Sequence, residues 1–140
     1  MYMLSPAMDF VMTLSALQSK VQKRVESQLN THGLSFTELM VMYNLSTAPS
    51  NTMRRIELAE NVGLSASGVT RLLTPMVKIN LVQKEVNPRD ARYSLVKLSD
   101  TGKQLLKDAL VAFEHSSETL TKPIQGKQLE RFIKLSEKLL

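Results

Sequence analysis

Hydrophobic side chains recur at three- and four-residue spacing along most of the chain, which is the period of helices that bury one face. The first such stretch covers residues 8–30. A second helix is expected to begin at Ser35, which forms a capping-box pair with Glu38, and to stop before the polar break at residues 48–51. A short helix is predicted over residues 54–62. Three helices are therefore expected in this part of the chain.

The pattern changes in the second half. Ser65 is a good N-cap for a fourth helix, whose apolar residues fall on one face and whose small polar and basic residues fall on the other. Residues 81–86 and 93–98 are rich in β-forming side chains and are joined by a polar turn, which predicts a hairpin. A long helix over 100–121 and a final helix follow. The predicted fold is mainly α with a small β-hairpin.

Two short helices joined by a tight glycine turn and followed by a hairpin make a winged helix-turn-helix. A recognition helix needs an apolar face that holds it on the domain and a compact polar face that enters the major groove of DNA. Ser65, Ser67 and Thr70 supply small hydroxyls on that polar face. Arg71 supplies a fork of donors for guanine or phosphate. These four residues are the candidate major-groove contacts, although such a helix face standing alone is more often simply solvated.

The tip of the hairpin has a different chemistry. Arginine on a thin loop can enter the minor groove, where the negative potential is strong, and Arg89 and Arg92 are the candidates. Asp90 would be repelled by phosphate, so we expect it to pair with Arg92 or to cap the turn. Arg54 and Arg55 are candidate phosphate contacts, with a solvated surface as the alternative.

Composition narrows the class of protein. The 140 residues are 43% hydrophobic and include no cysteine, which fits one ordinary folded domain and excludes a disulfide scaffold and thiol-based redox sensing. No apolar run is long enough to span a membrane, and the apolar N-terminal stretch lacks the basic start of a signal peptide. We therefore expect a cytoplasmic protein without a membrane partner.

The distribution of charge along the chain indicates more about function than the net charge of +5 does. Residues 54–97 contain eight basic and four acidic side chains, whereas residues 1–53 are balanced and residues 98–140 carry a net charge of +1. The excess therefore lies on the predicted helix-turn-helix and hairpin. Such a concentration is typical of a module that binds a polyanion, although charge alone fits a solvated basic surface equally well.

At this point several segments resemble a known family, the MarR family of bacterial transcription regulators. Asp90-Ala91-Arg92, followed by leucine, a hydroxyl residue and glycine in the segment 95–102, is similar to that family's most specific signature. The resemblance is tight over residues 35–105. It departs from the family pattern at three positions, with Ser99 in place of threonine, Asn80 in place of glycine, and Arg54 in place of a Ser or Thr cap.

The resemblance implies a homodimer that binds a pseudo-palindromic operator in double-stranded DNA, with Arg92 in the minor groove. It implies a division into a dimerisation helix (residues 1–34), a winged helix-turn-helix (35–99) and C-terminal dimerisation helices (100–140). It further implies a regulator, usually a repressor, whose DNA affinity is changed by a small-molecule effector. Methionines near the expected ligand crevice either line it or fill the core, and the candidates are Met40, Met42 and Met53.

Two other classes of function compete with this hypothesis. A winged helix that binds another protein and has lost DNA binding is the first, but the basic hairpin tip argues against it. An enzyme is the second, and no nucleophile–base pattern or phosphate loop supports it. Glu114, His115 and Glu118 share a helix and offer at most the edge of a metal site, although a solvated helix face is the expected role. We therefore predict no catalytic residue, metal or cofactor.

Overall fold

The computed structural model describes residues 1–90, 92 and 94–140. Tyr93, where the second hairpin strand was expected to start, and Ala91 of the wing motif lie outside the described residues. The helices and strands are α1 (Pro6–Leu29), α2 (Phe36–Thr47), β1 (Thr52–Arg54), α3 (Arg55–Val62), α4 (Ala66–Lys78), β2 (Val82–Val86), β3 (Ser94–Leu98), α5 (Asp100–Thr121) and α6 (Lys127–Glu137). Short 3-10 helices cover Asn30–His32, Pro49–Asn51 and Lys122–Ile124.

Side-chain caps fix where the helices begin. Ser35 accepts a hydrogen bond from the Glu38 backbone N–H (3.1 Å), and the Glu38 carboxylate accepts one from the Ser35 backbone N–H (2.9 Å). The predicted capping box is therefore confirmed. The first helix starts two residues earlier than predicted, because Ser5 caps it and Pro6 occupies its first position. Proline is well suited to that position since its fixed φ is helical and its missing N–H would be unpaired there.

The sheet has three strands rather than the two of the predicted hairpin. The strand order is β1-β3-β2, and both pairings are antiparallel. Strand β1 pairs Thr52 with Lys97 and Arg54 with Leu95. The short helix predicted over about residues 54–62 is present as α3, which begins at Arg55 with Arg54 as its N-cap, and the unpredicted strand β1 ends at the same Arg54. The consequence is that the wing is bonded to the segment that leads into the helix-turn-helix.

One hydrophobic core holds the winged helix-turn-helix together. Helices α2, α3 and α4 pack with the sheet, and the end of α1 and the first half of α5 close the core. Its largest fully buried side chains include Leu29, Leu39, Met42, Leu45, Leu58, Leu73, Met76 and Leu98. The turn between α3 and α4 is made by Gly63, whose φ of 71° is the left-handed conformation that glycine adopts without steric cost.

The predicted recognition helix is α4, and the chain that leaves it is in close contact with the start of α5. We call this contact, formed by Asn80 and Leu81 with Ser99 and Gly102, the joint. Asn80 follows α4 with φ of 61°, as predicted for a left-handed terminator. The Ser99 hydroxyl donates to the backbone carbonyls of Asn80 and Leu81 and accepts from the Gly102 N–H. A Cβ on Gly102 would lie 2.2 Å from the Leu81 carbonyl oxygen, so the two backbones meet without room for a side chain. The start of α5 is therefore held directly against the chain that leaves α4.

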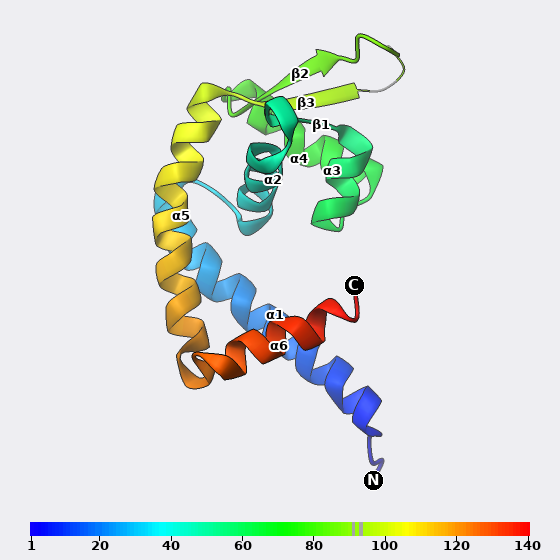
Figure 1. The fold of residues 1–140 in the computed structure, drawn as a ribbon, viewed down its shortest axis with the longest axis vertical. Coiled ribbons are helices and arrows are strands. Elements are labelled where there is room, and N and C mark those ends of the chain that lie inside the picture. The colour runs from blue at the N-terminus through cyan, green and yellow to red at the C-terminus, as the bar shows by residue number, and fades with distance from the viewer. Residues whose placement is uncertain (91, 93) are drawn as a thin grey trace.

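The wing lies at one end of the longest axis and the N-terminus lies at the other, whereas the C-terminus lies near the middle (Figure 1). Away from the wing, α1 leaves Phe10, Leu14 and Leu17 exposed, and α6 buries none of its side chains. The helical face predicted for residues 8–30 is therefore buried only at its C-terminal end, at Val25 and Leu29.

No helix within the described part of the chain is both long and apolar enough to cross a membrane.

Candidate nucleic-acid interface

The recognition helix α4 has the two faces that the sequence predicts. Val69, Leu73 and Met76 are buried, whereas Ser65, Ser67 and Arg71 are exposed. Ser65 is the N-cap, since its hydroxyl accepts from the Gly68 N–H at 3.1 Å. The Ser67 hydroxyl lies 3.2 Å from that of Ser65. Helix α4 therefore starts with a cluster of small hydroxyls beside the free N–H groups of its first turn, which together favour an anion.

Thr70, the remaining predicted residue of this face, is more enclosed than the others. It is half-buried, and its hydroxyl donates to the Ala66 carbonyl at 2.9 Å. The same oxygen accepts from Nη1 of Arg55 on α3 at 2.8 Å. No sequence pattern indicates this contact, because the two residues are 15 positions apart and lie on different helices. Thr70 is therefore a link between the two helices of the helix-turn-helix.

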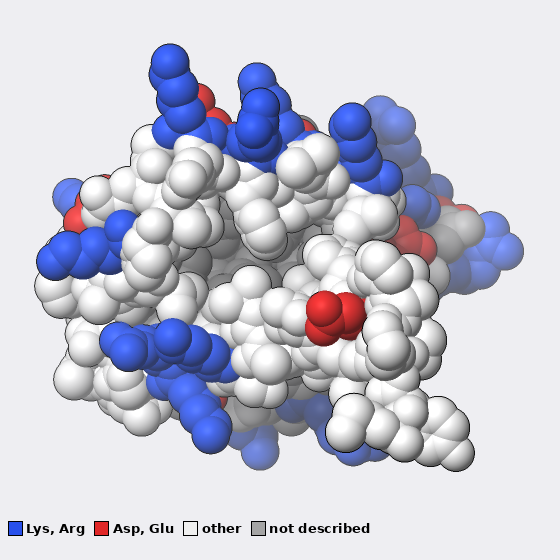
Figure 2. Space-filling model, turned by 90° about the horizontal axis from the view of Figure 1, so that it is seen from below, with Lys and Arg blue, Asp and Glu red and all other residues white. Residues whose placement is uncertain are grey.

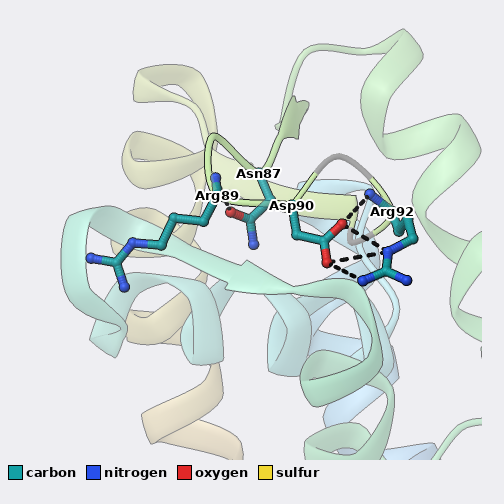
Figure 3. A network of polar contacts seen from close by, with 4 residues as sticks. All are labelled: Asn87, Arg89, Asp90 and Arg92. Atoms are coloured by element: carbon teal, nitrogen blue, oxygen red, sulfur yellow. Dashed lines mark hydrogen bonds and ion pairs between the residues drawn. The ribbon is translucent and has the colours of Figure 1, made fainter.

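The wing tip is organised by two short side-chain–backbone contacts. The Asn87 side chain accepts from the Arg89 N–H at 2.9 Å, and the Asp90 carboxylate accepts from the Arg92 N–H at 3.0 Å. The same carboxylate binds the Arg92 guanidinium through Nε (3.0 and 3.2 Å) and Nη2 (2.7 Å). The predicted Asp90–Arg92 pair is therefore present, and Asp90 also caps the turn (Figure 3).

The two wing arginines are not brought together. Figure 3 shows the Arg89 side chain extending on the opposite side of the loop from Arg92. The Arg92 side chain is 84% exposed in spite of its ion pair with Asp90. That pairing lowers the pKa of Asp90 and raises the pKa of Arg92, because each charged side chain stabilises the other through hydrogen bonds. Arg92 therefore offers an oriented and accessible cation.

A hollow of about 200 Å³ joins the helix-turn-helix to the wing. Its lining includes three arginines from three segments, namely Arg54, Arg55 and Arg92, and it is completed by Ile56, Ala66, Val69 and Ser94. Arg54 forms an ion pair with Glu57, with 2.7 Å between Nε and Oε1. The candidate phosphate contacts thus lie between the start of α4 and the wing, beside the same hollow as Arg92.

A second cavity, of about 430 Å³, lies between α2 and α5. It is lined by Phe36, Leu39, Met40, Tyr43, Leu110 and Phe113. The rings of Phe36 and Phe113 have centroids 5.5 Å apart and are inclined by 52°. Of the three candidate methionines, Met40 lines this cavity, whereas Met42 is fully buried in the core and Met53 packs against it. The cavity is apolar, and its lining includes none of the candidate DNA contacts.

Within the described residues, no group of three or more potential metal ligands is found. The helix face formed by Glu114, His115 and Glu118 on α5 is exposed.

Comparison with known proteins agrees with this geometry. A model of the family described as transcriptional regulator SarA/Rot matches residues 23–109, which is more than half of the chain. The chain is 30% identical over 105 residues to the uncharacterized HTH-type transcriptional regulator YwaE of Bacillus subtilis, covering 75% of this chain and 59% of that protein. It therefore spans less than two thirds of that relative. It is 20% identical to the transcriptional repressor MprA of Escherichia coli, over 89% of this chain and 70% of MprA.

A solved structure gives the fold. A mutant MarR from Escherichia coli, crystallised with operator DNA, superimposes with a TM-score of 0.86 at 19% identity, covering 96% of this chain and 95% of MarR. These matches are to transcriptional regulators and not to enzymes, as the sequence predicted. The family signature around the wing and the three-stranded winged helix agree with them. The chain belongs to the SarA/Rot family of transcriptional regulators and has the winged-helix fold of MarR.

Proposed function

We propose that the chain acts as a homodimeric, sequence-specific DNA-binding regulator that represses transcription and whose DNA affinity is changed by a small molecule. The observation that carries DNA binding is the Asp90–Arg92 pair, which orients an arginine whose side chain is 84% exposed at the wing tip. A carboxylate that is fully engaged by its arginine presents little repulsion to a phosphate, while the other edge of the guanidinium stays accessible. The fold of a MarR structure bound to operator DNA supports the same docking mode.

In this docking mode the start of α4 enters the major groove, which is about 12 Å wide. Ser65, Ser67, Thr70 and Arg71 then face bases and phosphates, and the helix N-terminus offers further N–H groups. The exposed Arg92, with Arg89 on the other side of the loop, reaches the adjacent minor groove or its phosphates. Arg54 and Arg55 lie between these two contacts and are suited to the intervening backbone.

The terminal helices support a homodimer. Exposed apolar side chains occur on α1 and on α6, and they include Phe10, Val11, Leu14, Phe132, Ile133 and Leu135. Figure 2, seen from the end at which the N-terminus lies, shows a mostly uncharged surface with lysines and arginines around it. Apolar area of this kind is stabilised when a second copy covers it. In the proposal, residues 1–34 and 100–140 pair, and residues 35–99 contact DNA.

The apolar cavity between α2 and α5 supports an effector. A volume of about 430 Å³ falls in the range of small-molecule sites, and its lining of two phenylalanines, Tyr43 and Met40 suits an apolar or aromatic compound. Because α5 also carries the joint at Gly102, a ligand that shifts α5 would shift α4. Such a shift changes the spacing of two recognition helices, which must match half-sites about one helical turn apart. The likeness to the repressor MprA supports repression as the output.

The test is in vitro selection of duplexes bound by the full chain, followed by binding at several salt concentrations. We expect selected sequences with two inverted half-sites and a steep loss of affinity with salt. Arg71→Ala and Arg92→Ala should each weaken binding by about tenfold or more, whereas Arg24→Ala on α1 should have little effect. If selection enriches no duplex and the chain does not bind random DNA, the result would contradict DNA binding and favour a winged-helix module that binds a protein.

A further inference from the structure

Two adjacent arginines at the start of α3 have different surroundings. Arg54 pairs with Glu57 at 2.7 Å. Arg55 is half-buried, and among the described residues no carboxylate lies within ion-pair distance of its guanidinium. Glu85, which lines a hollow together with Arg55, directs its carboxylate to Lys97 at 4.0 Å. The Arg55 guanidinium therefore carries no ion pair with a described carboxylate, and it is available to an anion from outside the chain.

Arg55 also occupies the meeting point of the DNA-facing elements. It begins α3, it donates to Thr70 on α4 at 2.8 Å, and it lines the hollow that Arg92 of the wing also lines. It lines a second hollow with Leu73 of α4 and residues of β2 and β3. A guanidinium has five N–H donors in a rigid fork, so one edge can bind Thr70 while another binds an oxygen of phosphate.

The contact with Arg55 fixes the Thr70 hydroxyl. A threonine hydroxyl has one hydrogen, and here that hydrogen is directed to the Ala66 carbonyl at 2.9 Å. Arg55 supplies a donor to the same oxygen. The hydroxyl therefore cannot rotate freely to suit different base edges, and its one remaining acceptor lone pair keeps a fixed direction toward the groove. An ordered side chain of this kind discriminates between bases better than a freely rotating one.

We propose that Arg55 is a positioning residue for sequence recognition: it takes a DNA phosphate as its counter-charge and, through Thr70, fixes how α4 contacts the bases. This proposal rests on the DNA-binding function proposed above and goes beyond a simple phosphate contact. A cation that touches only phosphate raises affinity for every sequence by the same factor. Arg55 instead raises the affinity for the preferred sequence more than the affinity for random DNA, because its guanidinium holds the Thr70 hydroxyl in one orientation.

The experiment compares two probes of equal length, a duplex selected in vitro by the wild-type chain and a random-sequence duplex. Binding is measured for the full-length wild type, R55A, R55K, T70V, T70S and the double variant R55A/T70V. Lys78→Ala, which removes an exposed cation from the last turn of α4, is the matched control. Circular dichroism and urea midpoints confirm that each variant is folded before binding is interpreted.

We expect R55A and T70V each to lower the ratio of selected to random affinity by about tenfold, which is within the range for loss of one specific base contact. The double variant should lose no more than either single variant, because both remove the same link. R55K should keep its affinity for random DNA and lose the ratio, since lysine keeps the charge but not the fork. T70S should retain the ratio, and K78A should weaken both probes equally.

Equal losses on the two probes for R55A, or additive losses in the double variant, would overturn the positioning role and leave Arg55 as an ordinary phosphate contact. If selection with the wild-type chain enriches no sequence and the chain does not bind random DNA, the proposed DNA-binding function itself is overturned, and the positioning role with it. The two failures are distinguished by the wild type: it binds no DNA if the proposed function is wrong, and it binds normally if only the positioning role is wrong.

Discussion

Arg92 binds the Asp90 carboxylate with both its guanidinium and its backbone N–H, so that one acidic residue orients the wing arginine and closes the turn that carries it. The pair lies two residues apart on an exposed loop, and the arginine side chain remains 84% exposed. An exposed ion pair contributes little to folding stability. Its effect is therefore expected in DNA binding, through a guanidinium that is already oriented before the encounter.

Replacing Asp90 by asparagine separates orientation from charge. Removal of a negative charge beside DNA would by itself strengthen binding, whereas loss of the bidentate pair leaves Arg92 free to rotate. Immobilising such a side chain on binding costs about 1 kcal/mol, so we expect D90N to weaken binding about fivefold, as measured by fluorescence anisotropy. Asp100→Asn, at the exposed start of α5, is the control and should not weaken binding. Stronger binding by D90N would contradict the orienting role.

The ion pair between Asp90 and Arg92 is expected to depend on pH, through the titration of Asp90. The pKa of Asp90 is lowered by its hydrogen bonds with Arg92, first those of the side chain and then that of the backbone. The pair is therefore complete above the usual aspartate range and is lost as the pH falls through the lowered pKa of Asp90. Carboxyl-carbon NMR titration should show Asp90 titrating below the usual aspartate value of about 3.9. In the R92A variant the Asp90 pKa should rise toward that value, and an unchanged titration would contradict the pairing.

The joint between α4 and α5 should be intolerant of any side chain at position 102. A Cβ there would lie 2.2 Å from the Leu81 carbonyl oxygen and 2.6 Å from Cδ1 of Leu98. Because neither backbone can withdraw without disturbing the core, we expect Gly102→Ala to reduce the free energy of unfolding by about 3 kcal/mol, as measured by urea denaturation. Thr101→Ala, one residue earlier and exposed, should stay within about 0.5 kcal/mol of wild type. A G102A chain as stable as T101A would show that the joint has slack.

The terminal helices should determine the oligomeric state. Phe132 on α6 is 42% exposed in the single chain, and burial of such a side chain against a second copy contributes about 2 kcal/mol. Phe132→Glu should therefore shift the chain to a monomer in light scattering after size-exclusion chromatography, and weaken binding to two-half-site duplexes. Val86→Glu, which places the same charge at an exposed apolar position on the wing, should leave the mass unchanged. If F132E retains the wild-type mass, α6 does not belong to the interface.

The cavity between α2 and α5 gives a test of the effector. Leu110 lines it, and a larger side chain at that position would fill it. We expect a set of small aromatic compounds to include some that raise the melting temperature of the wild type, by mass action on the folded state. Leu110→Trp should abolish those shifts, while Val111→Trp, on the exposed neighbouring position, should retain them. Shifts that persist in L110W would place the ligand elsewhere.

Sequence patterns predicted most of the fold because its elements carry local signals. Ser35, Ser65 and Ser99 are each N-caps, as expected, and the wing pair of Asp90 and Arg92 is a contact between residues two positions apart. Such features depend on neighbours in sequence, and short-range chemistry is enough to predict them.

The features that sequence patterns did not predict depend on contacts between distant segments. Strand β1 has three residues, too few for an alternating pattern, and it exists because β3 offers it a pairing edge. The bond between Arg55 and Thr70 requires α3 and α4 to be folded against each other. Likewise, the spacing of hydrophobic residues predicted that Phe10 lies on an apolar helix face, but it did not indicate that this face is exposed in the single chain.

The family signature consists of two parts that tolerate mutation differently. One part is the wing pair of Asp90 and Arg92, and the other is Ser99 and Gly102 in the joint. The first part, the exposed Arg92 and the half-buried Asp90, lies on a surface loop and can change without unfolding the chain, whereas Ser99 and Gly102 are buried and cannot. A descendant of this gene that lost DNA binding would therefore keep the serine and glycine and drift at the aspartate and arginine. Its sequence would still match a winged-helix family, so the wing pair is the position at which to distinguish a DNA-binding regulator from a winged helix that only retains the fold.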